Sequence, residues 1–171
     1  TCETAEDDKA ANRVRALADG LVGITQFEER VVAPKGWAHG DEQWLRFRRI
    51  SASGLARHHV LETLRSSRAA LLEHLAGTTA AAESFRLDQH FKPTDTGDVL
   101  AKVHRLAGKG PPVVDLDCEV DPWLVDPVLW QEQCKEEWSR YEEIRRELVR
   151  ISDAREKGKV DLLVERFRDH G

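Results

Sequence analysis

The sequence predicts a mainly α protein with about five to seven helices, a long charged C-terminal helix and an extended acidic loop that contains prolines. Charged residues make up 33% of the 171 residues, as in proteins with much exposed helix. Apolar residues recur at spacings of three and four in several windows, and Gly and Pro separate these windows. We divide the chain into a helical domain (1–108), the acidic loop (109–126) and a C-terminal helical part (127–171).

The first windows of the chain differ in how clearly they predict a helix. Thr4 and Asp7 have the spacing of a capping box, with Asp in place of Glu, and apolar positions follow at helical spacing. We expect a helix over residues 5–19. Residues 21–32 mix β-branched residues, which favour a strand, with residues that suit a helix, and slightly favour a helix. Asp41 then begins a short helix after a turn rich in Gly and Pro.

Three further helices are predicted in the first domain. Ser53 is a candidate N-cap for a helix that ends at Gly77. Residues 78–91 have high helix propensity until a proline follows. The next helix begins near Thr96 and ends at Gly108. The apolar stripes of the first and last of these helices consist of Val60, Leu64, Leu71 and Leu75, and of Val99, Leu100, Val103 and Leu106.

The acidic loop combines stiffness with apolar anchors. Residues 111–127 contain five acidic residues, no basic residue and four prolines. Trp123 and the aliphatic side chains of Val113, Val114, Leu116 and Leu124 are apolar anchors within the loop, which is unusual for a disordered tail. A long connection of this kind inside a compact domain usually has a role. Two placements remain open: the loop lies across the protein's own helices, or residues 111–126 form a strap on a neighbouring subunit.

The C-terminal part begins with a strong helix signal, because Asp126 can cap the helix that Pro127 starts. Its apolar stripe has a mean step of 3.5 residues, the heptad value of a coiled coil. This stripe can be covered either by a helix of the same chain, at 55–76, or by a helix of a partner. Because the stripe is narrow, it favours a projecting helix that a partner covers at least in part. Gly158 should end this helix, before a short helix with Val160, Leu163, Val164 and Phe167. The stripe consists of Trp130, Cys134, Glu137, Tyr141, Ile144, Leu148 and Ile151.

Few residues point to catalysis or to a metal. His58 and Glu62 lie four apart on a predicted helix, so they are the candidate metal ligands. Two ligands do not complete a site, and the Glu-x-x-His pairs of helical di-metal proteins are absent from the sequence. Cys118 lies between acidic residues, which raise a thiol pKa. We expect no metal and no cofactor, and the sequence favours a non-enzymatic protein. Histidines at the apolar edges of helices are His74, His90 and His104.

The net charge and the cysteine content limit the possible partners and the possible compartment. The net charge of −5 argues against a general nucleic-acid binder. Arg46, Arg48 and Arg49 form a local basic cluster beside aromatic residues, which is typical of contact surfaces. The three cysteines, at 2, 118 and 134, are odd in number and fit a reducing, intracellular compartment, either the cytoplasm or the mitochondrial matrix side. We expect no segment that spans a membrane.

Two short stretches resemble a known family. The sequences KGPPVVD (109–115) and KVDLLVERFRD (159–169), the latter after a long charged helix, are similar to features of subunit d of the mitochondrial ATP synthase peripheral stalk. The resemblance implies a non-catalytic stalk subunit on the matrix side, built of long helices and bound to other subunits.

The function that these features favour is a non-enzymatic structural or assembly subunit of a larger intracellular complex, which binds other protein subunits through helix contacts and the acidic loop. The alternative is a helical-bundle enzyme or ligand-binding protein that uses His58 and Glu62. A third, RNA contact through the basic cluster, fits the net charge least. The expected partner-binding residues are Trp130, Trp138, Tyr141, Ile144, Leu148, Ile151, Trp123, Arg46, Arg48 and Arg49.

Overall fold

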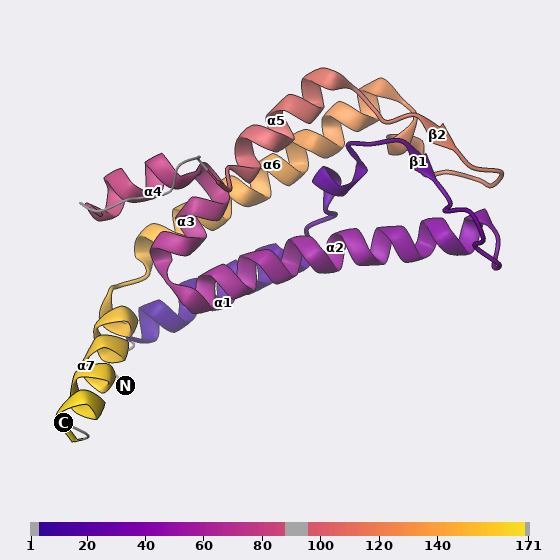
Figure 1. Ribbon diagram of the computed structural model, residues 1–171. Coiled ribbons are helices and arrows are strands. Elements are labelled where there is room, and N and C mark those ends of the chain that lie inside the picture. The colour runs from indigo at the N-terminus through magenta and orange to yellow at the C-terminus, as the bar shows by residue number, and fades with distance from the viewer. Residues whose placement is uncertain (1–3, 88–95, 170–171) are drawn as a thin grey trace.

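The computed structural model describes residues 4–87 and 96–169, and these form a mainly α fold, as predicted (Figure 1). Cys2, His90 and the end of the helix predicted over 78–91 lie outside the described residues. The α-helices of the described part are α1 (Ala5–Asp19), α2 (Asp41–Ser66), α3 (Arg68–Ala76), α4 (Thr78–Phe85), α5 (Val99–Lys109), α6 (Pro127–Arg150) and α7 (Ala154–Asp169). Short elements are the 3-10 helices η1 (Ile24–Phe27) and η2 (Pro122–Leu124) and the strands β1 (Val31–Val32) and β2 (Val114–Asp115).

Helix α6 is the centre of the fold. It packs along α1 and along α5, and it also contacts α3. Helix α2 lies beside α1 and leads into α3 (Figure 1). Helix α7 extends away from this body at the end where α1 begins. The chain's first and last helical segments therefore lie at the same end of the molecule.

Several helix boundaries follow from local signals that the sequence carries. Helix α1 spans the predicted residues, and both hydrogen bonds of its capping box are present, from the Asp7 amide to the Thr4 hydroxyl and from the Thr4 amide to the Asp7 carboxylate, each 3.1 Å long. The Asp126 carboxylate accepts hydrogen bonds from the amides of Val128 and Leu129 and so caps α6. All four residues of the predicted stripe of α5 are buried.

The two helices predicted between Asp41 and Gly77 are divided differently in the structure. Helix α2 runs without a break through Ser53, whose hydroxyl donates to the Leu21 carbonyl at 2.7 Å instead of capping a helix. The break lies at Ser67, which has extended backbone geometry and caps α3 by accepting a hydrogen bond from the Ala70 amide. Both serines are polar residues in a helical window, but Ser53 is engaged by a tertiary contact with Leu21, whereas Ser67 caps α3 through a local hydrogen bond.

Residues 21–32 form neither the helix that we expected nor a long strand. Their first amides are bound by the Glu137 carboxylate of α6, whose oxygens accept from the amides of Val22, Gly23 and Ile24 at 2.7–3.0 Å. Gly23 has a φ of 77°, and a Cβ there would lie 2.2 Å from the Ala52 carbonyl oxygen. This close approach to α2 requires glycine.

The acidic loop lies on the protein's own body, the first of the two placements that the sequence left open. Strand β2 pairs in parallel with β1, with Val31 opposite Val114. Leu124 is fully buried, and Trp123 packs partly buried against the core. Arg49 of α2 forms an ion pair with Asp121 at 3.1 Å. The loop is therefore fastened at both its apolar anchors and its charges.

A helix that crosses a membrane needs a long apolar stretch, and no helix within residues 4–87 and 96–169 has one.

Candidate interaction surface

The stripe of α6, which we call the α6 seam (Trp130, Cys134, Glu137, Tyr141, Ile144, Leu148 and Ile151), is covered by the chain itself. The exposed fractions of these seven residues lie between 0% and 8%. Helices α1, α3 and α5 supply the covering surface. The expectation that α6 projects and offers this seam to a partner is corrected accordingly. Its physical cause is that α1, α3 and α5 all pack against α6, so that together they cover its narrow stripe from within the chain.

The aromatic residues expected to contact a partner have mostly internal neighbours. The Trp130 indole donates to the Leu106 carbonyl at 2.8 Å, which joins α6 to α5. Trp123 stacks on Trp130 with 6.0 Å between ring centroids and meets Phe27 edge-on. Trp138, by contrast, is 38% exposed. Trp123 and Trp130 are thus part of the core packing, whereas Trp138 remains available at the surface.

The three arginines of the basic cluster point to different surroundings. Arg48 donates to the Gln26 carbonyl at 2.6 Å and lies over the Phe27 ring. Arg49 is held by Asp121. Arg46 is exposed on α2. Two of the three therefore fasten the fold, and the cluster does not present a continuous basic patch.

The metal candidates are not assembled into a site. Glu62 pairs with Arg65 at 2.9 Å on the exposed surface of α2. The His58 ring lies beside His59, with 6.2 Å between ring centroids. Within residues 4–87 and 96–169, no group of three or more His, Cys, Asp or Glu side chains is arranged to hold a metal ion. The spacing of four that the sequence shows does place both side chains on one helix, but no third ligand joins them there.

A row of rings connects the surface to the core. The rings of His59 and His74, and those of His74 and Tyr141, meet edge-on with centroids 5.7 and 6.3 Å apart. Nε2 of His74 is buried without a hydrogen-bond partner. Burial, together with the charges of His59 and Lys102, lowers the pKa of His74 to about 4. His74 is therefore neutral at pH 7 and acts as a core residue.

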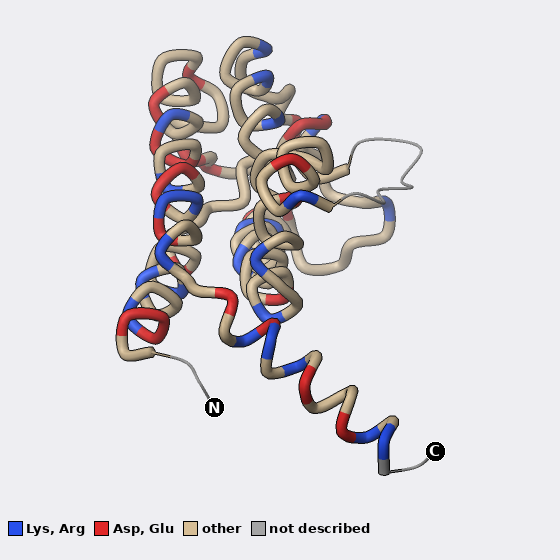
Figure 2. The backbone as a smooth tube through the Cα atoms, turned by 90° about the vertical axis from the view of Figure 1, so that its left-hand side faces the viewer, with Lys and Arg blue, Asp and Glu red and all other residues tan. Residues whose placement is uncertain are grey.

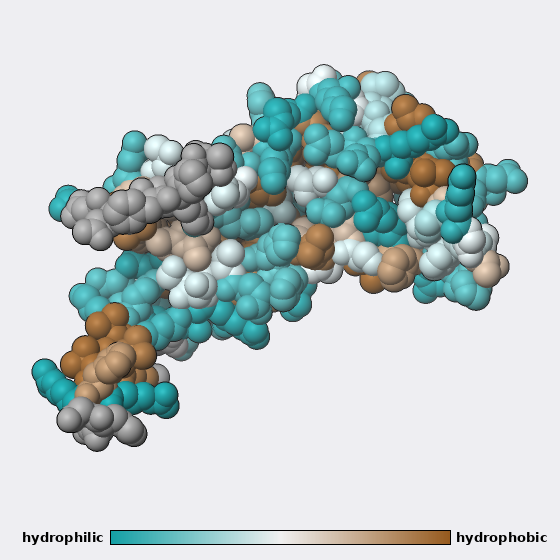
Figure 3. Space-filling view, in the orientation of Figure 1, coloured by the Kyte–Doolittle hydropathy of each residue, from teal (hydrophilic) through white to brown (hydrophobic). Residues whose placement is uncertain are grey.

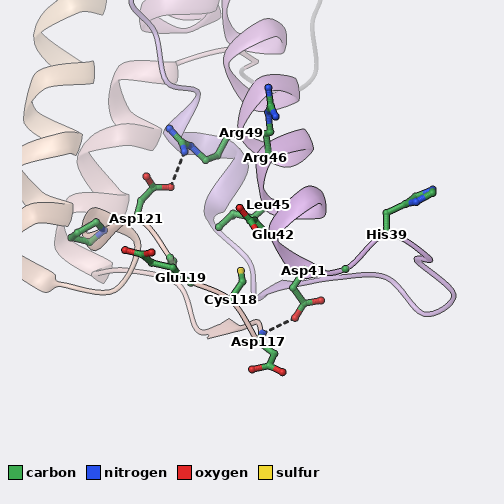
Figure 4. A pocket seen from close by; sticks show the side chains of 13 residues that line it. His39, Asp41, Glu42, Leu45, Arg46, Arg49, Asp117, Cys118, Glu119 and Asp121 are labelled. Carbon is green, nitrogen blue, oxygen red and sulfur yellow. Dashed lines mark hydrogen bonds and ion pairs between the residues drawn. The ribbon is translucent and has the colours of Figure 1, made fainter.

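An open groove of ≈ 840 Å³ separates the start of α2 from the acidic loop (Figure 4). The Asp41 carboxylate accepts from the Asp117 amide at 2.6 Å across this groove. Burial, with the negative charges of Asp41, Glu42 and Asp117, raises the pKa of the Cys118 thiol. A protonated thiol is a weak nucleophile, so Cys118 is not activated for covalent chemistry.

The joint between α6 and α7 is a set of polar contacts from three elements. Ser152 donates through its amide and its hydroxyl to the Asp7 carboxylate, at 2.6 and 2.8 Å. These bonds and those from Thr4 lower the pKa of Asp7 to about 2. Glu156 accepts from the Arg68 amide at the start of α3. The helix break therefore lies near Ser152, and Gly158, where we expected it, lies inside α7.

Beyond this joint, α7 carries a face of apolar side chains that the described chain does not cover. Lys159 still contacts the body, because its amine donates to the carbonyls of Arg65 and Ser66 at 2.8 Å each. The later residues project, and an apolar patch is visible over α7 in Figure 3. Val160, Leu163, Val164 and Phe167 recur at spacings of three and four and form what we call the α7 face. Their exposed fractions lie between 42% and 79%.

Charged residues surround the α7 face in an ordered way. At 100° per residue, Lys159 and Arg166 border the face on one side, and Lys157 and Arg168 on the other. Glu165 lies on the opposite side of the helix. Figure 2 shows these alternating charges along the projecting segment. Leu162 is 63% exposed but lies well away from the centre of the face.

No protein-family model, curated protein or solved structure matches this chain. We therefore infer its function from the surface of the chain itself.

The sequence predicts that the apolar residues of the α7 face lie in a short amphipathic helix, and the residues that it predicts for partner binding lie elsewhere. A signal was present, since four large apolar residues within eight positions exceed what an exposed terminal helix needs. The buried carboxylate of Glu137 also had a signal, because an acidic residue at a seam position requires a specific partner. Nothing local indicates that Asp7 and Ser152 meet across 145 positions.

Proposed function

We propose that this protein is a non-enzymatic structural or assembly subunit, which joins a larger complex by helix-to-helix contact through the α7 face. One observation carries the proposal: α7 leaves four large apolar side chains exposed on one face, while the comparable α6 seam is covered within the chain. Large apolar groups gathered on a projecting helix favour association, because burial of each contributes about 1.5–3 kcal/mol.

The surroundings of α7 support this role in a second way. The joint at Ser152 and the Lys159 contacts hold the first turns of α7 against α1, α2 and α3. A helix that is fixed at its base loses little freedom when a partner covers the remainder, so less of the binding energy is spent on ordering. Trp138 and Arg46, both exposed, are secondary contact candidates.

The resemblance to the stalk subunit d family points in the same direction. Its second stretch, residues 159–169, coincides with the exposed part of α7. We therefore include an intracellular location, in the cytoplasm or on the mitochondrial matrix side, and a stalk-like subunit role in the proposal. The likeness supports a role in assembly and supplies no catalytic residue.

The experiment compares two adjacent leucines of α7. Leu163→Asp places a charge within the α7 face, and Leu162→Asp places the same charge about 100° away. Each variant and the native chain are expressed in the native source, and their assemblies are separated by size and analysed for stoichiometry. We expect the native chain and Leu162→Asp to migrate in a complex of defined composition, and Leu163→Asp to migrate as the free chain.

Both variants should keep the helical circular dichroism and melting temperature of the native chain, because neither side chain is buried. Leu163→Asp migrating in the same complex as the native chain would reject the α7 face as the contact surface. A native chain that migrates alone would reject the assembly role altogether.

A further inference from the structure

The spacing within the α7 face is that of a helix that inserts into a groove. Its four side chains occupy positions i, i+3, i+4 and i+7, the anchor pattern with which an amphipathic helix binds an apolar groove of another protein. Leu163 and Val164, at the two edges of the face, lie about 100° apart around the helix. Phe167 is the most exposed of the four, at 79%. The face therefore fits a partner surface that is apolar at its centre.

The charges on the two borders of the α7 face have the same sign. Lys157 and Arg168 form one border, and Lys159 and Arg166 form the other. The stems of lysine and arginine are apolar, so they widen the surface that a partner can cover while their charges stay at its edges. A surface with complementary charge must therefore carry carboxylates on both sides of its apolar centre.

Two acidic residues of α7 leave these borders intact. Asp161 lies farther from the centre of the face than Arg168, at about 110° against about 90°. Glu156 is in line with the face, but its carboxylate accepts from the Arg68 amide at 2.9 Å and so belongs to the joint with the body. Within residues 157–168, the charged side chains nearest to the apolar ones are therefore basic.

The basic borders differ in what they contact within the chain. The Lys159 amine is bound to backbone carbonyls at the end of α2. Lys157 pairs with Asp153 at 3.0 Å, but its side chain is 71% exposed, and such a surface pair contributes little. Arg168 is exposed, and no carboxylate of residues 4–87 and 96–169 forms an ion pair with it. Arg168 is therefore the cation that gains most from an acidic partner.

The same charges argue against two other occupants of the face. Two copies of α7 would bring basic residues together at both borders, where they repel. An anionic membrane would attract the borders of α7 but repel the chain as a whole, whose net charge is −5. A protein surface with local carboxylates meets the borders without this opposition.

We propose that the α7 face binds an apolar groove between two helices of a different protein, and that Asp and Glu side chains line both rims of this groove. The inference rests on the proposed function and names the chemistry of the partner. A groove with two walls covers the face and both borders at once, so it buries more of a 16-residue helix than a flat contact does. The rim carboxylates fix the position of α7 within the groove.

The first test reverses one border charge in the assembly isolated from the native source. The assembly is diluted in steps at low salt, and the fraction of this chain that stays in it is measured. Arg168→Glu should raise the concentration at half-dissociation about tenfold, because it places a carboxylate against the acidic rim. Arg168→Lys should follow the native curve. The shift should shrink as salt rises.

The matched control is Arg105→Glu, which makes the same change in net charge at an exposed position of α5, away from α7. It should follow the native curve. A native curve for Arg168→Glu as well would overturn the inference.

The second border tests whether the groove has two acidic rims. Arg166→Glu should shift the dilution curve in the same direction as Arg168→Glu and by a similar factor. If only one of the two variants shifts the curve, the partner contacts one border, and the two-walled groove is rejected.

The charge of the partner is read directly with a carbodiimide, which joins a lysine amine to a carboxylate in contact with it and adds no spacer. In the assembly, mass spectrometry should find Lys157 joined to an Asp or Glu of a different protein. In the purified chain, Lys157 should be joined to Asp153, which shows that the amine reacts. Lys157→Arg should keep the assembly and lose the link. A Lys157 that is joined only to Asp153 in the assembly contradicts the acidic rim.

The outcomes separate this inference from the proposed function. If Leu163→Asp releases the chain from the assembly but reversal of Arg166 or Arg168 does not, the α7 face keeps its role and the acidic groove is rejected. A native chain that migrates alone rejects both. A purified chain that dimerises through Leu163 would identify a second copy as the occupant, and binding to vesicles of phosphatidylcholine and phosphatidylglycerol would identify a membrane. Either result overturns the acidic groove.

Discussion

Helices α6 and α7 follow one another in the chain and carry similar apolar stripes, yet one stripe is buried and the other is exposed. The α6 seam is covered by α1, α3 and α5, whereas the α7 face projects beyond the body. The difference arises at Ser152, where the contact with Asp7 ends α6 and turns the chain away from the core. An apolar stripe therefore shows that a surface needs covering, but not which chain covers it.

The largest expected effect distinguishes the buried α6 seam from the exposed α7 face. Tyr141→Asp together with Leu148→Asp should unfold the protein, because each places a charge in a buried position at a cost of about 4 kcal/mol or more. The two costs together approach the free energy of unfolding of a typical domain. Leu163→Asp with Phe167→Asp, the matched pair on α7, should leave the melting temperature unchanged in thermal denaturation at low protein concentration. Equal melting temperatures for the two pairs would place the α6 seam at the surface.

The next effect concerns the polar member of the α6 seam. Glu137→Ala leaves the amides of Val22, Gly23 and Ile24 without their acceptor and should lower the free energy of unfolding by about 3 kcal/mol or more. Urea denaturation measures this change. Glu136→Ala is the control, because Glu136 is exposed and forms a surface ion pair with Arg140, so its loss should change stability by less than about 0.5 kcal/mol.

A smaller effect, which depends on pH, tests the burial of His74 beside the α6 seam. The pKa of His74 is lowered to about 4, from an ordinary 6.5, mainly by burial. The folded state thus disfavours the protonated form, so its stability is complete above pH 6.5 and falls as pH drops toward 4. The loss should reach about 2–3 kcal/mol. His74→Phe should remove this slope in denaturation curves recorded across that range, whereas the exposed His104 changed to Phe should retain it.

The smallest effect tests the joint that separates the two helices. The pKa of Asp7 is lowered to about 2, below its ordinary 3.8, by hydrogen bonds from Ser152 and Thr4. Its contribution is therefore present above pH 3.8 and is lost as pH falls toward 2. Asp7→Asn should lower the melting temperature at pH 7 and have much less effect near pH 2. An identical decrease at both pH values would show that the carboxylate charge is irrelevant; Asp8→Asn, on the exposed surface, should have no effect at either.

Sequence alone determined the helical class, the start and end of α1, the stripe of α5 and the cap of α6. Each of these depends on residues within a few positions of one another, such as Thr4 with Asp7 or Asp126 with Pro127. Local hydrogen bonds and helical periodicity decide such features before the chain folds, so a pattern in the sequence is sufficient to predict them.

Only the tertiary structure decided which apolar surface is left for a partner. The Ser152 contact with Asp7, the Glu137 contact with residues 22–24 and the packing of α5 and α1 around α6 join positions far apart in the chain. Such contacts depend on the relative placement of whole helices, and a stripe of apolar residues is the same whether its own chain or another covers it. The sequence therefore shows that an apolar surface of the C-terminal region must be covered. In the fold, the chain itself covers α6, and the apolar face that stays exposed lies on α7.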